Sequence, residues 1–131
     1  MIGLDTNIIV RYLAQDDPAQ STDATRLIEG RLTVDNPGFV SDVAIAETAW
    51  VLERAYGLTD AAIAATIESM LQTDVLVIEH EQEVFGAMIA LEDGLGSFAD
   101  ALISALGRNA GCASTLTFDQ KALRIPGFKS I

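Results

Sequence analysis

The stretch that decides the fold is "IGLDTNIIV", residues 2 to 10, where a short apolar run ends at Asp5 and the polar pair Thr6 and Asn7 follows. The chain then becomes apolar again, with helical spacing over residues 6–14. This pattern predicts a buried strand that ends at Asp5 and leads directly into a helix. Working sites of parallel α/β sheets lie at the carboxyl ends of strands. The position of Asp5 therefore indicates a functional site at the end of the first strand.

The rest of the chain repeats the alternation of apolar strands and helices. Asp17 and Pro18 predict a helix start, and Gly30 predicts its end. Strands are expected within residues 36–42, 75–80, 112–118 and 127–131, and helices within 16–30, 43–57, 59–73, 81–94, 97–111 and, briefly, 119–125. Alternating strands and helices predict an α/β fold whose parallel sheet is covered on both faces. The length of 131 residues predicts one domain, residues 1–131.

Composition restricts the class of protein. No apolar stretch has the length of a membrane span, and the N-terminus lacks the basic segment of a signal peptide. The single cysteine, Cys112, forms no internal disulfide, so we expect a cytoplasmic protein without a membrane partner. The chain has 8 basic and 19 acidic residues, a net charge of −11. A chain this acidic does not attract a polyanion by its overall charge, so a divalent metal ion would have to bridge the two, and a basic protein partner would be attracted. The alternative is that the acidity only keeps a small protein soluble.

Two carboxylates are predicted at strand ends. Asp5 ends the first strand, and Asp119 follows "STLTF" at the same kind of junction. Because the carboxyl ends of parallel strands meet at one edge, we expect both side chains at the same edge of the sheet. Either residue taken alone also fits an ordinary helix N-cap.

Two further acidic residues lie inside apolar helical segments. Glu47 shares a helix face with Val43, Trp50 and Val51, so we expect its carboxylate to be buried and therefore paired, protonated or bound to metal. The alternative is an ion pair with Arg54 or another arginine. Asp100 lies in "SFADALISAL", and its spacing from Ser97 also fits a capping box.

Hard oxygen ligands of this kind favour Mg²⁺ or Mn²⁺ over zinc, since the chain has one histidine and one cysteine. His80 lies among Glu79, Glu81 and Glu83, which predicts a solvated run of charges. Cys112 is expected in the core, which argues against a Cys112–His80 nucleophile pair. No glycine-rich phosphate loop is present.

Four blocks of the sequence, in order and at the usual spacing, resemble the PIN-domain ribonucleases, specifically the VapC-type toxins of type II toxin–antitoxin systems. The blocks are "IGLDTNIIVRYL", "SDVAIAETAWVL", "SFADALISAL" and "TLTFDQKALRIPGF". The resemblance covers the whole chain and includes all four acidic positions. It implies a five-stranded parallel sheet of order 3-2-1-4-5 between helices.

The resemblance also implies an activity and its residues. It implies endonucleolytic RNA cleavage with Mg²⁺ (or Mn²⁺) held by Asp5, Glu47, Asp100 and Asp119. Asn7 and Thr117 would support these ligands through hydrogen bonds, and Thr6 is a weaker member of that group. Arg11 and Lys121 lie within two turns of Asp5 and Asp119, so they are candidates for RNA contact, with exposed salt bridges as the alternative.

A nuclease toxin implies an antitoxin that inhibits it with a basic segment. Residues 43–52 and 61–71 are more apolar than one face of a small sheet requires, so we expect either a homodimer contact, an antitoxin groove, or packing of the two helices on each other. Toxin–antitoxin hetero-oligomers would follow.

Two other function classes remain open. A phosphorelay receiver is also small, acidic and Mg²⁺-binding, but "VLVIEH" ends in Glu79 and no late strand ends in lysine before proline. A catalytically inactive PIN-like binding module is the second alternative, and the complete acidic set argues against it.

Overall fold

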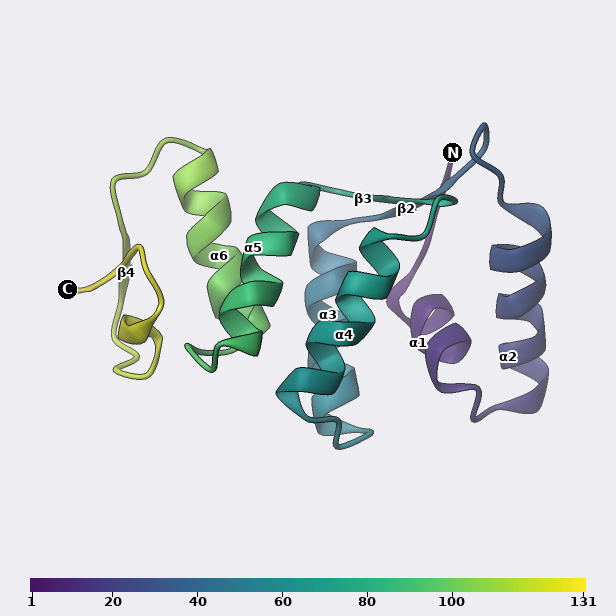
Figure 1. Cartoon of the computed structure of the whole chain (residues 1–131), viewed down its shortest axis with the longest axis horizontal. Helices are drawn as coiled ribbons and strands as arrows, with labels where there is room; N and C mark the ends of the chain where they lie inside the picture. Colours follow the sequence, from purple (N-terminus) through teal and green to yellow (C-terminus); the bar gives the residue numbers. More distant parts are fainter.

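The computed structural model describes residues 1–131, and each predicted strand and helix forms close to its expected bounds (Figure 1). The order along the chain is β1 (Ile2–Gly3), α1 (Thr6–Ala14), α2 (Pro18–Thr25), a π-helical segment η1 (Arg26–Arg31), β2 (Gly38–Val40), α3 (Asp42–Arg54), α4 (Asp60–Leu71), β3 (Leu76–Ile78), α5 (Glu81–Glu92), α6 (Phe98–Asn109), β4 (Thr115–Thr117), a 3₁₀ turn η2 (Ala122–Arg124) and β5 (Phe128–Ser130).

Hydroxyl and carboxylate caps set the starts of the helices. Ser41, Thr59 and Ser97 each accept a hydrogen bond from the backbone N–H three residues on, which satisfies one of the free donors at the starts of α3, α4 and α6. Asp17 caps α2 in the same way, directly before Pro18. These local interactions explain why the helix starts were readable from the sequence.

One face of the sheet forms the centre of the core. Leu4, Val40 and Ile78 are buried on that face and belong to one apolar cluster with side chains from the helices. On the opposite face Val77 is 41% exposed, and Figure 1 shows the helices gathered on one side of β2 and β3. The prediction of helices on both faces therefore holds for one face of the sheet only.

The strands are parallel, as predicted, but they form two sheets. β1, β2 and β3 pair in that order, with Gly3 beside Phe39 and Phe39 beside Val77. β4 pairs with β5 alone. The continuous order 3-2-1-4-5 is wrong at one junction, because β1 does not pair with β4.

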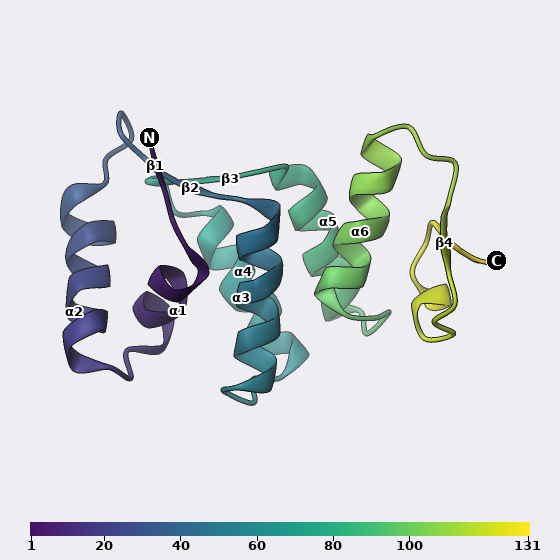
Figure 2. The same cartoon turned by 180° about the vertical axis from the view of Figure 1, so that it is seen from behind.

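Close contacts on α6 explain where β4 and β5 lie. Ser104 donates a hydrogen bond to the carbonyl of Pro126 (2.7 Å). A Cβ at Gly127 would overlap the Ser104 hydroxyl, and a Cβ at Gly107 would lie 2.9 Å from Thr115 Oγ1. The two glycines let the β4–β5 unit approach α6 closely. Figures 1 and 2 accordingly show β4 on the far side of α5 and α6 from β1.

Two smaller findings concern the cysteine and the character of the helices. Cys112, predicted in the core, is exposed because it precedes β4 in the loop after α6. None of the helices has both the length and the apolar character that crossing a membrane requires.

The core assignment yields a stability prediction. Ile45 of α3 is 0% exposed, so Ile45→Ala should lower the free energy of unfolding by about 2–5 kcal/mol, through lost burial and the cavity left behind. Val43, two residues earlier, is 68% exposed, and Val43→Ala should change it by less than about 0.5 kcal/mol. Urea unfolding of both variants measures the difference, and equal effects would contradict the assigned helix face.

Candidate functional site

Asp5 and Glu47 come together in the folded chain. Asp5 follows β1 and caps α1, accepting a hydrogen bond from the Thr6 N–H (2.8 Å). Glu47 lies in the middle of α3, which packs against α1. The two residues line one open pocket of about 430 Å³, together with Thr6, Asn7, Val10, Arg11, Val51, Ala55 and Tyr56. Both side chains are exposed, so the pocket presents two carboxylates to solvent at the carboxyl end of β1.

The prediction that Glu47 is buried is wrong. α3 turns Ile45, Thr48 and Leu52 into the core, which leaves the face of Glu47 outside, and Trp50 on that face is 59% exposed. The alternative of an ion pair with Arg54 does not form either, since the Arg54 guanidinium lies over the Trp50 ring, 5.7 Å from its centroid. The Glu47 carboxylate therefore has no protein partner and can accept a cation.

The two polar residues near Asp5 differ in whether their side chains make hydrogen bonds within the chain. Asn7 is exposed and its amide makes no hydrogen bond within the chain. Arg11 is engaged: its guanidinium forms a salt bridge with Asp16 (3.1 Å) and donates to the Gln20 side chain (2.8 Å). The salt-bridge alternative for Arg11 is the arrangement observed, and this contact has little effect on stability at an exposed position.

Asp100 is in the first turn of α6. Its N–H donates to the Ser97 hydroxyl (3.1 Å), but its carboxylate makes no hydrogen bond, so only half of a capping box forms. The Asp100 carboxylate, half-buried at a helix N-terminus, is a free oxygen donor.

Asp119 follows β4 and forms a local turn. Its carboxylate accepts from the Lys121 N–H (2.9 Å), and its own N–H donates to the Thr117 hydroxyl (2.9 Å). Thr117 therefore does orient the backbone at Asp119. Lys121 is exposed and makes no ion pair.

The four predicted carboxylates do not form one cluster within the single chain. Asp100 and Asp119 do not line the pocket of Asp5 and Glu47, and no three of the four offer oxygens within 4.8 Å of one another. Asp5 and Asp119 also end strands of different sheets. The structure thus brings Asp5 and Glu47 together and leaves Asp100 and Asp119 apart from them.

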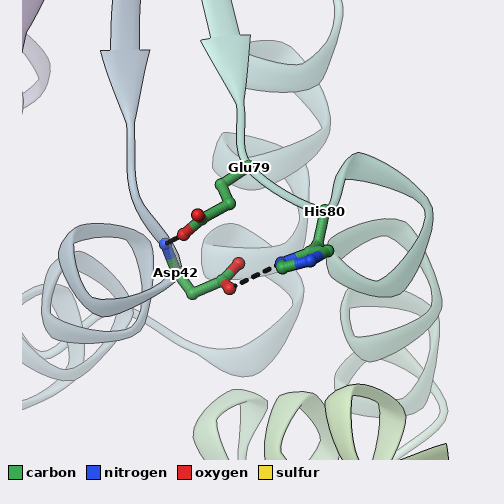
Figure 3. A group of neighbouring side chains, drawn as sticks. All are labelled: Asp42, Glu79 and His80. Atoms are coloured by element: carbon green, nitrogen blue, oxygen red, sulfur yellow. Dashed lines mark hydrogen bonds and ion pairs between the residues drawn. The ribbon is translucent and has the colours of Figure 1, made fainter. Parts of the chain in front are cut away.

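A second acidic group, which the sequence analysis did not assemble, lies at the ends of β2 and β3 (Figure 3). Asp42, Glu79 and His80 each offer one ligand atom within 4.8 Å of the others. The His80 ring nitrogen Nδ1 lies 2.7 Å from Asp42 Oδ2, and Glu79 accepts from the Asp42 N–H (2.9 Å). His80 is therefore not simply part of a solvated charge run. The signal was present in the sequence, because "SD" and "EH" each end a strand and the two strands are neighbours.

The charges of this group depend on one another. Burial raises the pKa of Asp42 above its ordinary value, the bond to His80 acts against this, and the Glu79 charge adds to it. The hydrogen bond to the Asp42 carboxylate raises the pKa of His80. Two carboxylates and an imidazole fit a divalent cation chemically. Here they already bind one another, and Glu79 helps to cap α3, so their present role is to join the ends of β2 and β3.

Comparison with known protein families assigns the chain to one of them. The model of the PIN domain matches residues 2–127, nearly the whole chain, and the protein belongs to the PIN domain family. PIN domains are in general nucleases that need a divalent metal ion. No curated protein matches the chain. The family match argues against the phosphorelay receiver alternative.

The Asp42–His80 pair predicts how stability depends on pH. A histidine with a raised pKa contributes stability that is fully present below its unfolded value of about 6.5 and is lost as the pH rises through the folded value. The free energy of unfolding of the wild type should therefore exceed that of His80→Asn by a larger amount at pH 6 than at pH 9. Asparagine suits this position because residue 80 has φ +48°.

Urea unfolding at the two pH values measures the difference. Above pH 6, the free energy of unfolding should depend less on pH in His80→Asn than in the wild type. A stability gap that is the same at pH 6 and pH 9 would show that protonated His80 does not bind Asp42 in solution.

Proposed function

We propose that this PIN domain is an Mg²⁺- or Mn²⁺-dependent endoribonuclease and the toxin of a type II toxin–antitoxin pair. Asp5, Glu47, Asp100 and Asp119 are the proposed metal ligands and catalytic acids. The observation that carries the proposal is the pair Asp5 and Glu47, which present carboxylates to one open pocket at a strand end of a PIN fold. Asn7 and Thr6 line the same pocket and are proposed to position ligands.

The donor chemistry of the pocket fits a hard divalent cation. Both side chains offer carboxylate oxygens, Glu47 has no competing ion pair, and one oxygen of Asp5 is free of hydrogen bonds. A bound divalent ion lowers the pKa of a coordinated water and neutralises charge on the attacked phosphate. In-line attack by the water oxygen on phosphorus breaks the bond to the 3′ oxygen, which leaves a 5′-phosphate and a 3′-hydroxyl. The proposed task of Asp5 and Glu47 is to hold that centre and orient the water.

The strongly acidic chain gives RNA few attractive surfaces apart from the metal. Lys121 is the better of the two RNA-contact candidates, because it is exposed without an ion pair, whereas Arg11 is tied to Asp16 and Gln20. We propose that Lys121 binds a phosphate next to the one attacked. Arg11 would have to release its salt bridge first.

The proposed antitoxin binds by charge and by an apolar anchor. Without the four site acids the chain still has 15 acidic residues against 8 basic ones, so its excess charge extends beyond the pocket. A separate cavity of about 270 Å³ between α3 and α6 is lined mainly by apolar residues, with Trp50 and Phe98 among them. We propose that a basic antitoxin segment inserts an apolar side chain there.

One observation favours a second candidate, a catalytically inactive PIN-like binding module. Asp100 and Asp119 lie apart from Asp5 and Glu47 within the single chain. A site left with two carboxylates would bind metal weakly. An activity assay distinguishes the two candidates.

The nuclease proposal predicts that the purified protein, free of partner, cleaves a structured RNA with Mg²⁺ or Mn²⁺ and stops in EDTA. Asp5→Asn and Glu47→Gln should each lower the rate at least about a hundredfold, since both remove a charged ligand. Glu53→Gln is the matched control, because Glu53 is also exposed on α3 but does not line the pocket of Asp5. Its rate should equal that of the wild type.

A second measurement tests the metal site without activity. Saturating Mg²⁺ should raise the urea midpoint of the wild type and of Glu53→Gln by mass action, and should raise that of Asp5→Asn much less. Undiminished cleavage by Asp5→Asn would point to a contaminating nuclease. Absence of cleavage in every preparation, with metal bound, would favour the inactive module.

The antitoxin proposal predicts a salt-dependent affinity. Raising the salt from about 0.1 M to 1 M shortens the Debye length from about 10 Å to about 3 Å, so the dissociation constant should increase at least about tenfold. A version of the segment with its arginines and lysines changed to glutamine should lose this dependence. An affinity that salt does not change would exclude an electrostatic contribution.

A further inference from the structure

Two further cavities adjoin the pocket of Asp5 and Glu47 and lead across α1 toward α2 and η1. The first has a volume of about 480 Å³ and shares Asn7 and Arg11 with that pocket. The second has a volume of about 460 Å³ and shares Arg31 with the first. α1 packs against α2, and Figures 1 and 2 show the two helices side by side at one end of the molecule. We call these two cavities the arginine groove.

The charge of the arginine groove is opposite to that of the whole chain. Three of its lining residues are arginines, Arg11, Arg26 and Arg31, and Asp23 is the one acidic residue among them. The whole chain has 8 basic and 19 acidic residues. Arg26 and Arg31 are exposed, and neither forms an ion pair. The groove is therefore a cationic surface on a strongly anionic protein.

The π-helical geometry of η1 places two of these arginines together. The Leu32 N–H donates to the Leu27 carbonyl, five residues back, at 2.9 Å. In an α-helix, residues five apart such as Arg26 and Arg31 would lie about 140° apart around the axis. The wider π-helical turn reduces this angle, and both side chains line the second cavity. π-helical turns are rare and occur frequently at functional sites.

Hydrogen bonds between side chains fix the two walls of the groove. The Tyr12 hydroxyl of α1 donates to Glu29 of η1 (2.7 Å), and the Gln15 amide donates to the Thr25 hydroxyl of α2 (3.1 Å). These bonds hold α1 against α2 and η1 before any ligand binds. A preformed groove loses little conformational entropy on binding, which favours its use as a binding surface.

We propose that the arginine groove binds a single-stranded segment of RNA, whose successive phosphates lead from the candidate metal site over Arg11 to Arg31 and Arg26. Guanidinium groups bind phosphate oxygens through paired hydrogen bonds, and cationic grooves follow the backbone of single strands. The inference rests on the proposed function for the position of the cut. Three arginines would repel the basic segment proposed for the antitoxin, so the groove favours RNA over that partner.

Asp16 occupies the place of a phosphate on Arg11. The Nη1 atom of Arg11 lies 3.1 Å and 3.4 Å from the two carboxylate oxygens of Asp16, which also accepts a hydrogen bond from the Tyr56 hydroxyl (2.7 Å). An RNA phosphate offers the same kind of oxygen acceptor. Asp16 therefore competes with RNA for Arg11, and loss of its charge should strengthen RNA binding.

The test measures binding of a fluorescent, unstructured 12-nucleotide RNA in EDTA at about 50 mM salt, where the RNA stays intact and no metal contributes. Arg26→Gln and Arg31→Gln should each increase the dissociation constant several-fold, and the double variant should increase it at least about tenfold. The salt dependence of the double variant should weaken by about 1.4 in log K against log salt, because each phosphate contact of a single strand contributes about 0.7.

Arg108→Gln is the matched control. Arg108 is exposed on α6, forms no ion pair and lines neither cavity, so this variant loses the same charge outside the groove. Its dissociation constant should stay within about twofold of the wild type. A wild type that does not bind the RNA, or an Arg108→Gln variant weakened as much as Arg31→Gln, would overturn the proposal.

Two further measurements test the occupant of the groove. Asp16→Asn should bind the 12-nucleotide RNA several-fold more tightly, and an unchanged or weaker affinity would contradict the competition for Arg11. Polyglutamate of 12 residues should displace the RNA only at much higher concentration. Displacement at equal concentration would identify an acidic protein segment as the occupant and would reject RNA.

Cleavage assays separate this inference from the nuclease proposal. A dinucleotide has one phosphate, which would lie at the metal, so the double variant should cleave it at the wild-type rate. Its kcat/KM for the 12-nucleotide RNA should fall at least about tenfold. RNA binding that depends on the arginines, without any cleavage by the wild type, would retain the groove and reject the nuclease. Cleavage of both substrates at wild-type rates by the double variant would retain the nuclease and reject the groove.

Discussion

The register of three short parallel strands determines where the acidic side chains of this protein lie. Leu4, Val40 and Ile78 form one buried row across the sheet, so the residues that follow them emerge at the same edge. Gly38 allows this row to form, since a Cβ there would lie 2.8 Å from atoms of Leu4 and Leu32. Because side chains alternate with period two, a slip of one residue would bury Gly3 and expose Leu4. The placement of Asp5, Asp42 and Glu79 thus depends on apolar packing.

Much of this arrangement could be predicted from the sequence because its causes are local. Caps such as Ser97, apolar periodicity and glycine stops specify each helix, and the alternation of elements specifies parallel strands. The absence of a β1–β4 pair could not be predicted in the same way, because an open strand edge leaves no mark in the residue pattern. The burial of Glu47 was misjudged for a related reason. α3 is apolar on several faces, and periodicity does not say which of them the rest of the chain covers.

The two acidic groups differ in the partners of their carboxylates more than in the number of carboxylates that they hold. Asp42, Glu79 and His80 are close together because they bind one another and tie two strand ends. Asp5 and Glu47 face solvent with unused oxygens, which a folded protein has no structural reason to bring together. The sequence analysis named Asp5 and Glu47 through the order of the motifs, and their role stays a prediction. It did not group Asp42, Glu79 and His80, because these residues meet only when β2 and β3 align.

The outer edges of β1 and β4 have no strand partner, and these two open edges carry a hazard for the handling of this protein. The edges are different surfaces, and a contact between different surfaces closes into a ring only if the geometry returns to its start; otherwise it continues into a filament. The strands on both sides have only two or three residues, so each junction holds few hydrogen bonds. Short edges of this kind limit the growth of long fibres. At high concentration, we expect this protein to form reversible oligomers of mixed size before it precipitates.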